Sequence, residues 1–172
     1  IVNIESNELY LSLNDGIEIK NVDFFDIDDN LIGGAVDNGI EVRSSFFGDV
    51  NNNAVIAVGS NGIRVDDSKL VGVRYNDVLG TVANGVYVTK SVGIGIIGND
   101  IVGTGLNGIS VVDSALVGVL GNSTFFTRPS PCSRVSRTMA CSSLALVGMS
   151  LRPSSRACAI SRSISTRAWS EP

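Results

Sequence analysis

Asn61-Gly62-Ile63-Arg64-Val65 is one copy of a pattern that returns every 23 residues along this chain. The other copies are Asp15-Gly16-Ile17-Glu18-Ile19, Asn38-Gly39-Ile40-Glu41-Val42, Asn84-Gly85-Val86-Tyr87-Val88 and Asn107-Gly108-Ile109-Ser110-Val111. Two further columns keep the same period, and they hold Asn7, Asn30, Asn53, Asn76, Asn99 and Asn122, and Ser45, Ser68, Ser91 and Ser114. Columns in constant register over several repeats indicate a solenoid in which each repeat forms one coil.

Apolar residues within each repeat alternate with a period of two, as in Ile63-Arg64-Val65 and Val71-Gly72-Val73. This is the spacing of β-strands, whose side chains point alternately to opposite faces, and it differs from helical spacing. Three short strands per repeat would pair with their counterparts in neighbouring coils about 4.8 Å away, which makes three parallel sheets. The sequence therefore predicts an all-β protein, a parallel β-helix (β-solenoid) of 23-residue coils with three short strands per coil.

Four apolar columns are expected to face the interior of this β-helix. They comprise Ile17, Ile40, Ile63, Val86 and Ile109; Ile19, Val42, Val65, Val88 and Val111; Ile4, Ile27, Val50, Val73, Ile96 and Val119; and Leu9, Ile32, Val55, Val78 and Ile101. We interpret the Asn7 column as structural, because a coil corner needs a left-handed backbone residue, which Asn tolerates. Its stacked amides would also hydrogen-bond from coil to coil.

Charge divides the chain into two unlike parts. Residues 1–127 contain 16 acidic and six basic side chains, a net charge of −10, whereas residues 128–172 contain one Glu and seven Arg, a net charge of +6. Because an acidic body repels phosphate backbones, we expect no nucleic-acid partner. No apolar stretch is long enough to predict a membrane span. All three cysteines, Cys132, Cys141 and Cys158, lie in the second part.

The predicted β-helix covers residues 1–123, about five and a half coils, because Ser130-Pro131 stands where the next Asn-Gly is due. Residues 124–172 form a tail rich in Ser and Arg, for which disorder and translation out of frame remain alternatives. The second is suggested by Met139-Ala140-Cys141-Ser142-Ser143, which codons for Asn-Gly-Val-Leu-Val encode when read one base late. Since the repeat is already under way at Ile1, we expect the chain to be a piece of a longer protein.

The run Asn-Gly-Ile-x-Val-x-x-Ser followed by Val-x-Val-x-x-Asn resembles the repeats of right-handed parallel β-helix proteins. These include pectate lyases and other pectin lyase-like proteins, mannuronan C5-epimerases and the periplasmic accessory proteins of nitrous oxide reductase. The resemblance covers residues 1–123 and implies a right-handed coil and a secreted, periplasmic or cell-surface location. It implies little about activity, because the repeat reports coil geometry. The Asp-Pro-His-Asp motif of the epimerases is absent, and the chain contains no His for acid–base work.

The outward side chains of the Asn-Gly strands are the candidate ligand-contact site. Its members are Glu41, Arg64, Tyr87, Thr89 and Ser110. The resemblance implies that lyase-like families hold acidic polysaccharide on this sheet, where a base and charge neutralisation are needed. The weak catalytic candidates there are Arg43, Arg64, Asp66 and Tyr87. The alternative is an ordinary solvated sheet, in which Glu41 lies beside Arg64 and Arg43 beside Asp66 as cross-strand charge pairs.

Acidic side chains of the first coils form a candidate metal site. Asp26 and Asp49 share one column, and Glu5 and Asp28 share the column two residues further on. Hard oxygen ligands at this density suit Ca²⁺, while the alternative is a solvated acidic edge. Apart from Ca²⁺, no cofactor is expected.

The leading functional interpretation is a non-catalytic extracellular module, a rigid solenoid that presents a sheet surface to a carbohydrate or to another protein. The alternative is a fragment of a polysaccharide lyase or C5-epimerase acting on acidic polysaccharide, with its catalytic coils outside this segment. Strands at the end of a solenoid have unpaired edges, and the last coils carry apolar outward residues. We therefore expect further coils or a cap at the 112–123 end.

Overall fold

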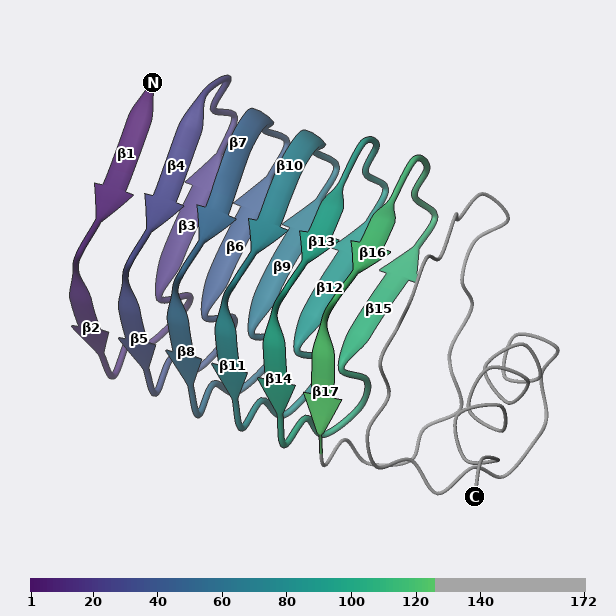
Figure 1. The fold of residues 1–172 in the computed structure, drawn as a ribbon. Helices are drawn as coiled ribbons and strands as arrows, with labels where there is room; N and C mark the ends of the chain where they lie inside the picture. The colour runs from purple at the N-terminus through teal and green to yellow at the C-terminus, as the bar shows by residue number, and fades with distance from the viewer. Residues whose placement is uncertain (126–172) are drawn as a thin grey trace, which may run out of the picture.

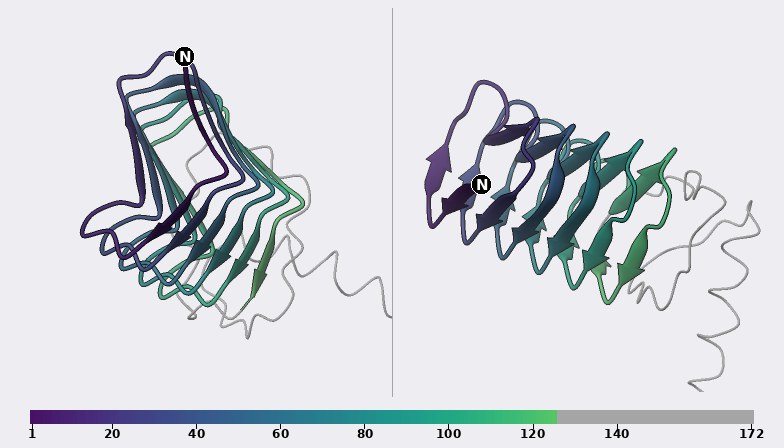
Figure 2. Two further views of the ribbon diagram at one scale, coloured as in Figure 1. Left: turned by 90° about the vertical axis from the view of Figure 1, so that its left-hand side faces the viewer. Right: turned by 90° about the horizontal axis from the view of Figure 1, so that it is seen from above.

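The computed structural model describes residues 1–125, which form 17 short strands and no helix within that range. Three strands make one coil, and successive coils stack side by side into three parallel sheets (Figure 1). Seen from the side and from above, the coils follow one another as near copies along one axis (Figure 2). The all-β solenoid with three strands per coil is thereby confirmed. Most of the tail predicted for residues 124–172 lies outside the described residues.

The three sheets run the length of the solenoid. Sheet A contains β1 (Val2–Glu5), β4 (Phe25–Asp28), β7 (Phe46–Asn51), β10 (Lys69–Arg74), β13 (Gly95–Ile97) and β16 (Gly118–Leu120). Sheet B contains β2 (Glu8–Tyr10), β5 (Leu31–Gly33), β8 (Ala54–Ile56), β11 (Asp77–Leu79), β14 (Asp100–Val102) and β17 (Ser123–Phe125). Sheet C contains β3 (Ile17–Lys20), β6 (Ile40–Arg43), β9 (Ile63–Asp66), β12 (Val86–Thr89) and β15 (Ile109–Val112).

Paired residues lie 23 positions apart, as the repeat predicts. Val65 of β9, for example, is the partner of Val88 in β12. The last strand, β17, keeps this register against β14, with Phe125 opposite Val102. The β-helix therefore continues two residues past the boundary at 123 that the sequence predicts.

The interior holds the four apolar columns that were expected there. Their central members are completely buried, whereas Ile4, Leu9 and Ile109 near the two ends are only partly buried. A fifth inward column, which the sequence analysis did not single out, adds Phe25, Val71, Ile94 and Val117. Its large Phe25 ring lies where a side chain on Gly48 would otherwise project, so a Cβ at Gly48 would collide with that ring.

The Asn7 column forms an amide ladder, as expected, which is buried from Asn30 to Asn122, but it does not supply the left-handed corner. Each amide Nδ2 donates to the Oδ1 of the next coil, as Asn53 does to Asn76 at 3.0 Å. The left-handed residues stand one position earlier, where Ser6, Asp29, Asn52, Tyr75, Gly98 and Gly121 have φ between 52° and 66°. The expectation that the ladder Asn residues occupy the left-handed corner is therefore wrong, and their observed role is hydrogen bonding between coils.

The Ser45 column is a second buried ladder of the same kind. The backbone N–H of Ser45 donates to Oγ of Ser68 at 3.1 Å, and Ser68 Oγ donates to the carbonyl of Asp66 at 2.8 Å. Ser68 and Ser91 repeat the pattern one coil further on. Both ladders satisfy backbone groups at coil corners, where sheet pairing is interrupted.

Candidate functional site

Four charged side chains of β6 and β9 form a continuous row on the outward face of sheet C. Glu41 accepts a hydrogen bond from Arg43 of its own strand and pairs with Arg64 of the next coil at 3.2 Å. Arg64 in turn pairs with Asp66 at 2.9 Å. The predicted Glu41–Arg64 pair is present, whereas Arg43, although it lies opposite Asp66 in the register, turns to Glu41 instead.

Glu41 is the unexpected member of this row, because it points outward and yet is only 1% exposed. Burial and the nearby Asp15 carboxylate raise the pKa of Glu41, and the two arginines only partly oppose that rise. The Glu41 carboxylate in turn raises the pKa of Arg43. The row therefore contains a buried acid whose ionised form is costly in the folded state.

The structure corrects the expected exposure of the candidate ligand-contact site. Glu41, Ser110 and Thr89 leave the sheet on its outward side, but Ser110 is 5% and Thr89 7% exposed, so none of the three presents a free surface. Arg64 and Tyr87 are half-buried neighbours in adjacent strands. Of the predicted contact residues, Arg64 and Tyr87 are thus the two that a ligand on this face can reach.

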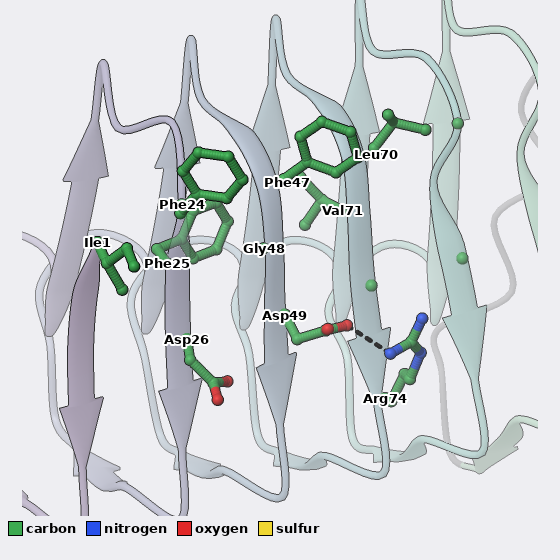
Figure 3. Close-up of a pocket in the computed structure, with 13 residues that line it drawn as sticks. Ile1, Phe24, Phe25, Asp26, Phe47, Gly48, Asp49, Leu70, Val71 and Arg74 are labelled. Carbon is green, nitrogen blue, oxygen red and sulfur yellow. Dashed lines mark hydrogen bonds and ion pairs between the residues drawn. The ribbon is translucent and has the colours of Figure 1, made fainter.

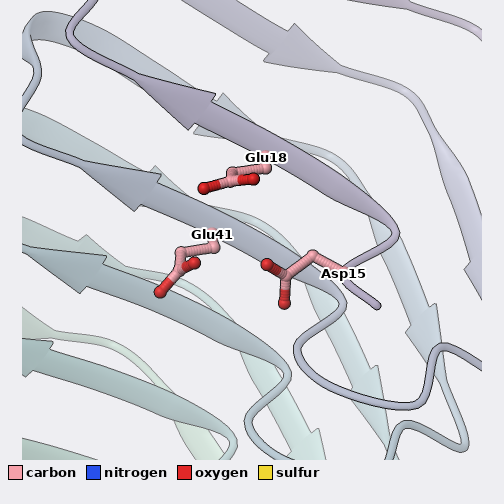
Figure 4. A group of neighbouring side chains, drawn as sticks. All are labelled: Asp15, Glu18 and Glu41. Atoms are coloured by element: carbon pink, nitrogen blue, oxygen red, sulfur yellow. The ribbon is translucent and has the colours of Figure 1, made fainter. Parts of the chain in front are cut away.

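Asp15 completes an acidic group that the sequence analysis did not bring together. One carboxylate oxygen each of Asp15, Glu18 and Glu41 lies within 4.8 Å of the others (Figure 4). Oxygen ligands at this spacing fit a cation, although Glu41 already has two arginine partners. A signal was present in the sequence, because Asp15 is the one Asp in a column otherwise filled by Asn.

The four residues predicted to bind Ca²⁺ lie in two adjacent outward columns of sheet A. Asp26 is the register partner of Asp49, and Glu5 is the partner of Asp28. Burial, followed by the charges of Asp28, Asp49 and Glu5, raises the pKa of Asp26. Asp49, however, turns to an arginine of β10, Arg74, with which it pairs at 2.6 Å.

Asp28 and its register partner Asn51 each keep one side-chain oxygen buried without a hydrogen-bond donor. Two neighbouring acceptors that lack donors are what a bound cation would satisfy. The oxygen atoms around Asp28, with its register partner Glu5 and with Asp26 nearby, are therefore of the kind that Ca²⁺ prefers.

The family model that describes the right-handed beta helix region matches residues 1–124. The chain belongs to the right-handed beta helix family. This agrees with the resemblance seen in the repeat and assigns the handedness of the coil, which the spacing by itself leaves open. A comparison with curated proteins finds no match.

Two solved structures resemble this β-helix protein, and both are mutants of the periplasmic alginate epimerase AlgG. A single mutant aligns with a TM-score of 0.56 at 18% identity, and a double mutant with a TM-score of 0.51 at 19% identity. Each alignment covers 73% of this chain and 39% of the epimerase chain. At such identity the likeness shows the shared fold. Along residues 1–125, no helix has the length and hydropathy required to cross a membrane.

Stability should depend on pH through Glu41. A raised folded-state pKa means that the stability contribution of Glu41 is complete below its ordinary value of 4.5 and is lost as pH rises through the folded pKa. We expect the free energy of unfolding of the parent, relative to Glu41→Gln, to fall as pH rises above 4.5. Urea denaturation at several pH values measures this difference.

Asp15→Asn is the matched control, because it restores the residue type of its column and removes the charge that adds to the rise in the pKa of Glu41. The pH-dependent loss should shrink in that variant. A difference between parent and Glu41→Gln that stays constant from about pH 4 to about pH 8 would contradict the prediction.

Calcium should stabilise the chain through Asp28. Selective binding to the folded state raises the melting temperature, so the midpoint in millimolar Ca²⁺ should exceed that in chelator. Asp28→Asn should abolish the rise, whereas Glu18→Gln, which alters the acidic group on sheet C, should retain it. Identical melting curves with Ca²⁺ and with chelator would contradict a site at Glu5, Asp26, Asp28 and Asp49.

Proposed function

We propose that this β-helix is a non-catalytic module that contacts carbohydrate through the outward face of sheet C. The observation that carries the proposal is the row of ion pairs from Arg43 through Glu41 and Arg64 to Asp66. Both arginines that could serve as a base, Arg43 and Arg64, are ion-paired with carboxylates. A surface of this kind binds and orients a ligand but offers no free base.

Tyr87 and Arg64 supply the contact in this proposal. Tyr87 is the register partner of Arg64 on one side and of Ser110 on the other. A half-exposed aromatic ring beside a guanidinium can receive the apolar face of a sugar and hydrogen-bond its hydroxyl groups. The similar epimerase AlgG is periplasmic, and an extracellular or periplasmic location would suit this module.

A fragment of a polysaccharide lyase or C5-epimerase is the second candidate. Its support is the likeness to AlgG, of which this chain spans 39%. In that case the missing acid and base would come from coils outside this chain.

An assay on polyuronates tests whether this chain catalyses either reaction by itself. We expect the full 172-residue chain, given pectate or alginate with Ca²⁺, to show no increase in the absorbance of unsaturated uronate ends. The physical reason is that elimination or epimerisation needs a free base and an acid at one sugar, while the body, at −10, repels a polyanion. Proton NMR of the treated alginate reports epimerisation in the same sample. A steady reaction that disappears in Arg64→Ala would favour the lyase or epimerase.

Carbohydrate binding to sheet C is tested through the signals of Tyr87. Titration of the full chain with cellohexaose should shift the ring signals of Tyr87 in NMR spectra, and alginate oligomers serve as the polyanionic comparison. Tyr87→Ala should weaken binding at this face about tenfold, the usual worth of one aromatic contact. Tyr87 signals that stay unmoved by every oligomer would overturn the proposal for sheet C.

A further inference from the structure

A groove of about 600 Å³ lies open on the outward face of sheet A (Figure 3). One of its sides is a row of apolar side chains from successive coils, namely Phe24, Phe47 and Leu70. The other side carries Asp26, Asp49 and Arg74 from strands β4, β7 and β10. The groove is therefore amphipathic, and it extends across coils along the solenoid axis.

The apolar row occupies positions that folding alone does not favour. Phe47 and Leu70 have φ of 49° and 55°, in the left-handed region, and their side chains are 46% and 45% exposed. Large side chains pay a conformational cost in that region, where Gly, Asn or Asp would be preferred. Because these residues also leave apolar surface in water, neither backbone geometry nor core packing accounts for their identity.

The two exposed aromatic rings of this row are held parallel to each other. The Phe24 and Phe47 rings are nearly parallel, at 4°, with centroids 5.8 Å apart. Phe46, the neighbouring residue in β7, packs edge-on against Phe47, with the two ring centroids 4.4 Å apart. Two exposed parallel rings in consecutive coils offer repeated apolar platforms to a ligand that runs along the solenoid.

The polar side of the groove is also preorganised. Asp49 and Arg74 pair at 2.6 Å, and both side chains remain 43% exposed. They lie over Gly72, where a Cβ would collide with Asp49 Oδ1 and press on the Arg74 guanidinium. Gly72 thus leaves room for a pair that presents donors and acceptors side by side, the arrangement that vicinal hydroxyl groups satisfy.

We propose that this sheet A groove binds a neutral glycan chain. Sugar rings combine an apolar C–H face, which would lie on Phe24 and Phe47, with a hydroxyl edge that would reach Asp49 and Arg74. Two carboxylates, Asp26 and Asp49, against one guanidinium leave the groove acidic, which disfavours a polyanion. A stable protein partner needs about 800 Å² on each side, more than this single row of side chains offers. The proposal goes beyond the function proposed for sheet C, because it concerns another face.

Substitution by Asn gives a sharp test, because Asn tolerates the left-handed backbone and removes the apolar side chain. The full chain is titrated with cellohexaose and mannohexaose, and the ring signals of Phe24 are followed by NMR. We expect saturable shifts in the parent and about tenfold weaker binding in Phe47→Asn and in Leu70→Asn. The melting temperature of both variants should stay unchanged or rise. Tyr87→Ala is the control on sheet C and should leave the Phe24 titration unaltered.

Three outcomes would overturn the proposal. One is the absence of Phe24 shifts with either hexaose at millimolar concentration. Another is undiminished binding in Phe47→Asn together with a lower melting temperature, which would assign Phe47 a structural role. The third is a parent that self-associates and binds no glycan, together with a monomeric Phe47→Asn variant. That result would make the groove a contact between copies of this chain. Loss of Tyr87 shifts alone leaves this proposal intact and counts only against sheet C.

Discussion

Val65→Asp is expected to unfold the β-helix. Val65 is completely buried in β9, with Val42 and Val88 as its register partners in the coils on either side. An aspartate there would be ionised without a partner or protonated without a hydrogen bond, and either state costs about 4 kcal/mol or more. Because whole domains are stable by only about 5–15 kcal/mol, most molecules should lose the fold.

Circular dichroism during thermal and urea denaturation measures this loss. Val82→Asp makes the same chemical change at a side chain that is exposed, so it should shift the free energy of unfolding by less than about 0.5 kcal/mol. If Val65→Asp melted within about a degree or two of the parent, the assignment of inward and outward columns would be wrong.

Asn76→Leu should be the next most damaging change, although it keeps the branched shape of the side chain and its number of heavy atoms. Asn76 Oδ1 accepts from the backbone N–H and the Nδ2 of Asn53, and its own Nδ2 donates to the Val50 carbonyl and to Asn99 Oδ1. Leucine removes all four bonds and leaves buried backbone groups without partners. At about 1–3 kcal/mol for each unsatisfied group, we expect a loss of about 4 kcal/mol.

Asn7→Leu is the matched control in the same column. Asn7 is exposed in the first coil, and its Nδ2 donates to Glu5 and to Asn30. Water can replace these partners, so the loss should remain below about 1 kcal/mol. Equal losses at the two positions would show that the ladder contributes through local backbone preference and not through buried hydrogen bonds.

These two predictions concern features that the sequence and the structure describe in the same way. The period of 23, the alternation within strands and the columns of Asn and Ser were all readable in the sequence, since each coil repeats the same local pattern. The prediction of the left-handed corner failed, because the local pattern does not mark that position. That corner is occupied by residues as different as Asp29, Tyr75 and Gly98, so no residue type marks it.

The candidate sites were less readable, because they depend on contacts between columns. Alternation predicts that Glu41 leaves the sheet on its outward side, and it does so. Its burial follows from Arg43 and Arg64, which come from two different strands and cover it together. The groove on sheet A has a similar origin, since Phe47 and Asp49 come from one coil, Leu70 and Arg74 come from the next, and they meet only when coils stack.

The sequence by itself determined the solenoid, its coil length and its interior. The reason is that the direction of each side chain alternates locally along a strand, and stacking repeats the same arrangement in every coil. The tertiary structure alone decided that Glu41 is buried, that Asp15 joins it, and that sheet A has a groove. The physical reason is that exposure depends on how far neighbouring side chains of other coils reach over a residue. How far a side chain reaches depends on its rotamer and on the 23-residue register together, so the sequence of a single repeat does not determine it.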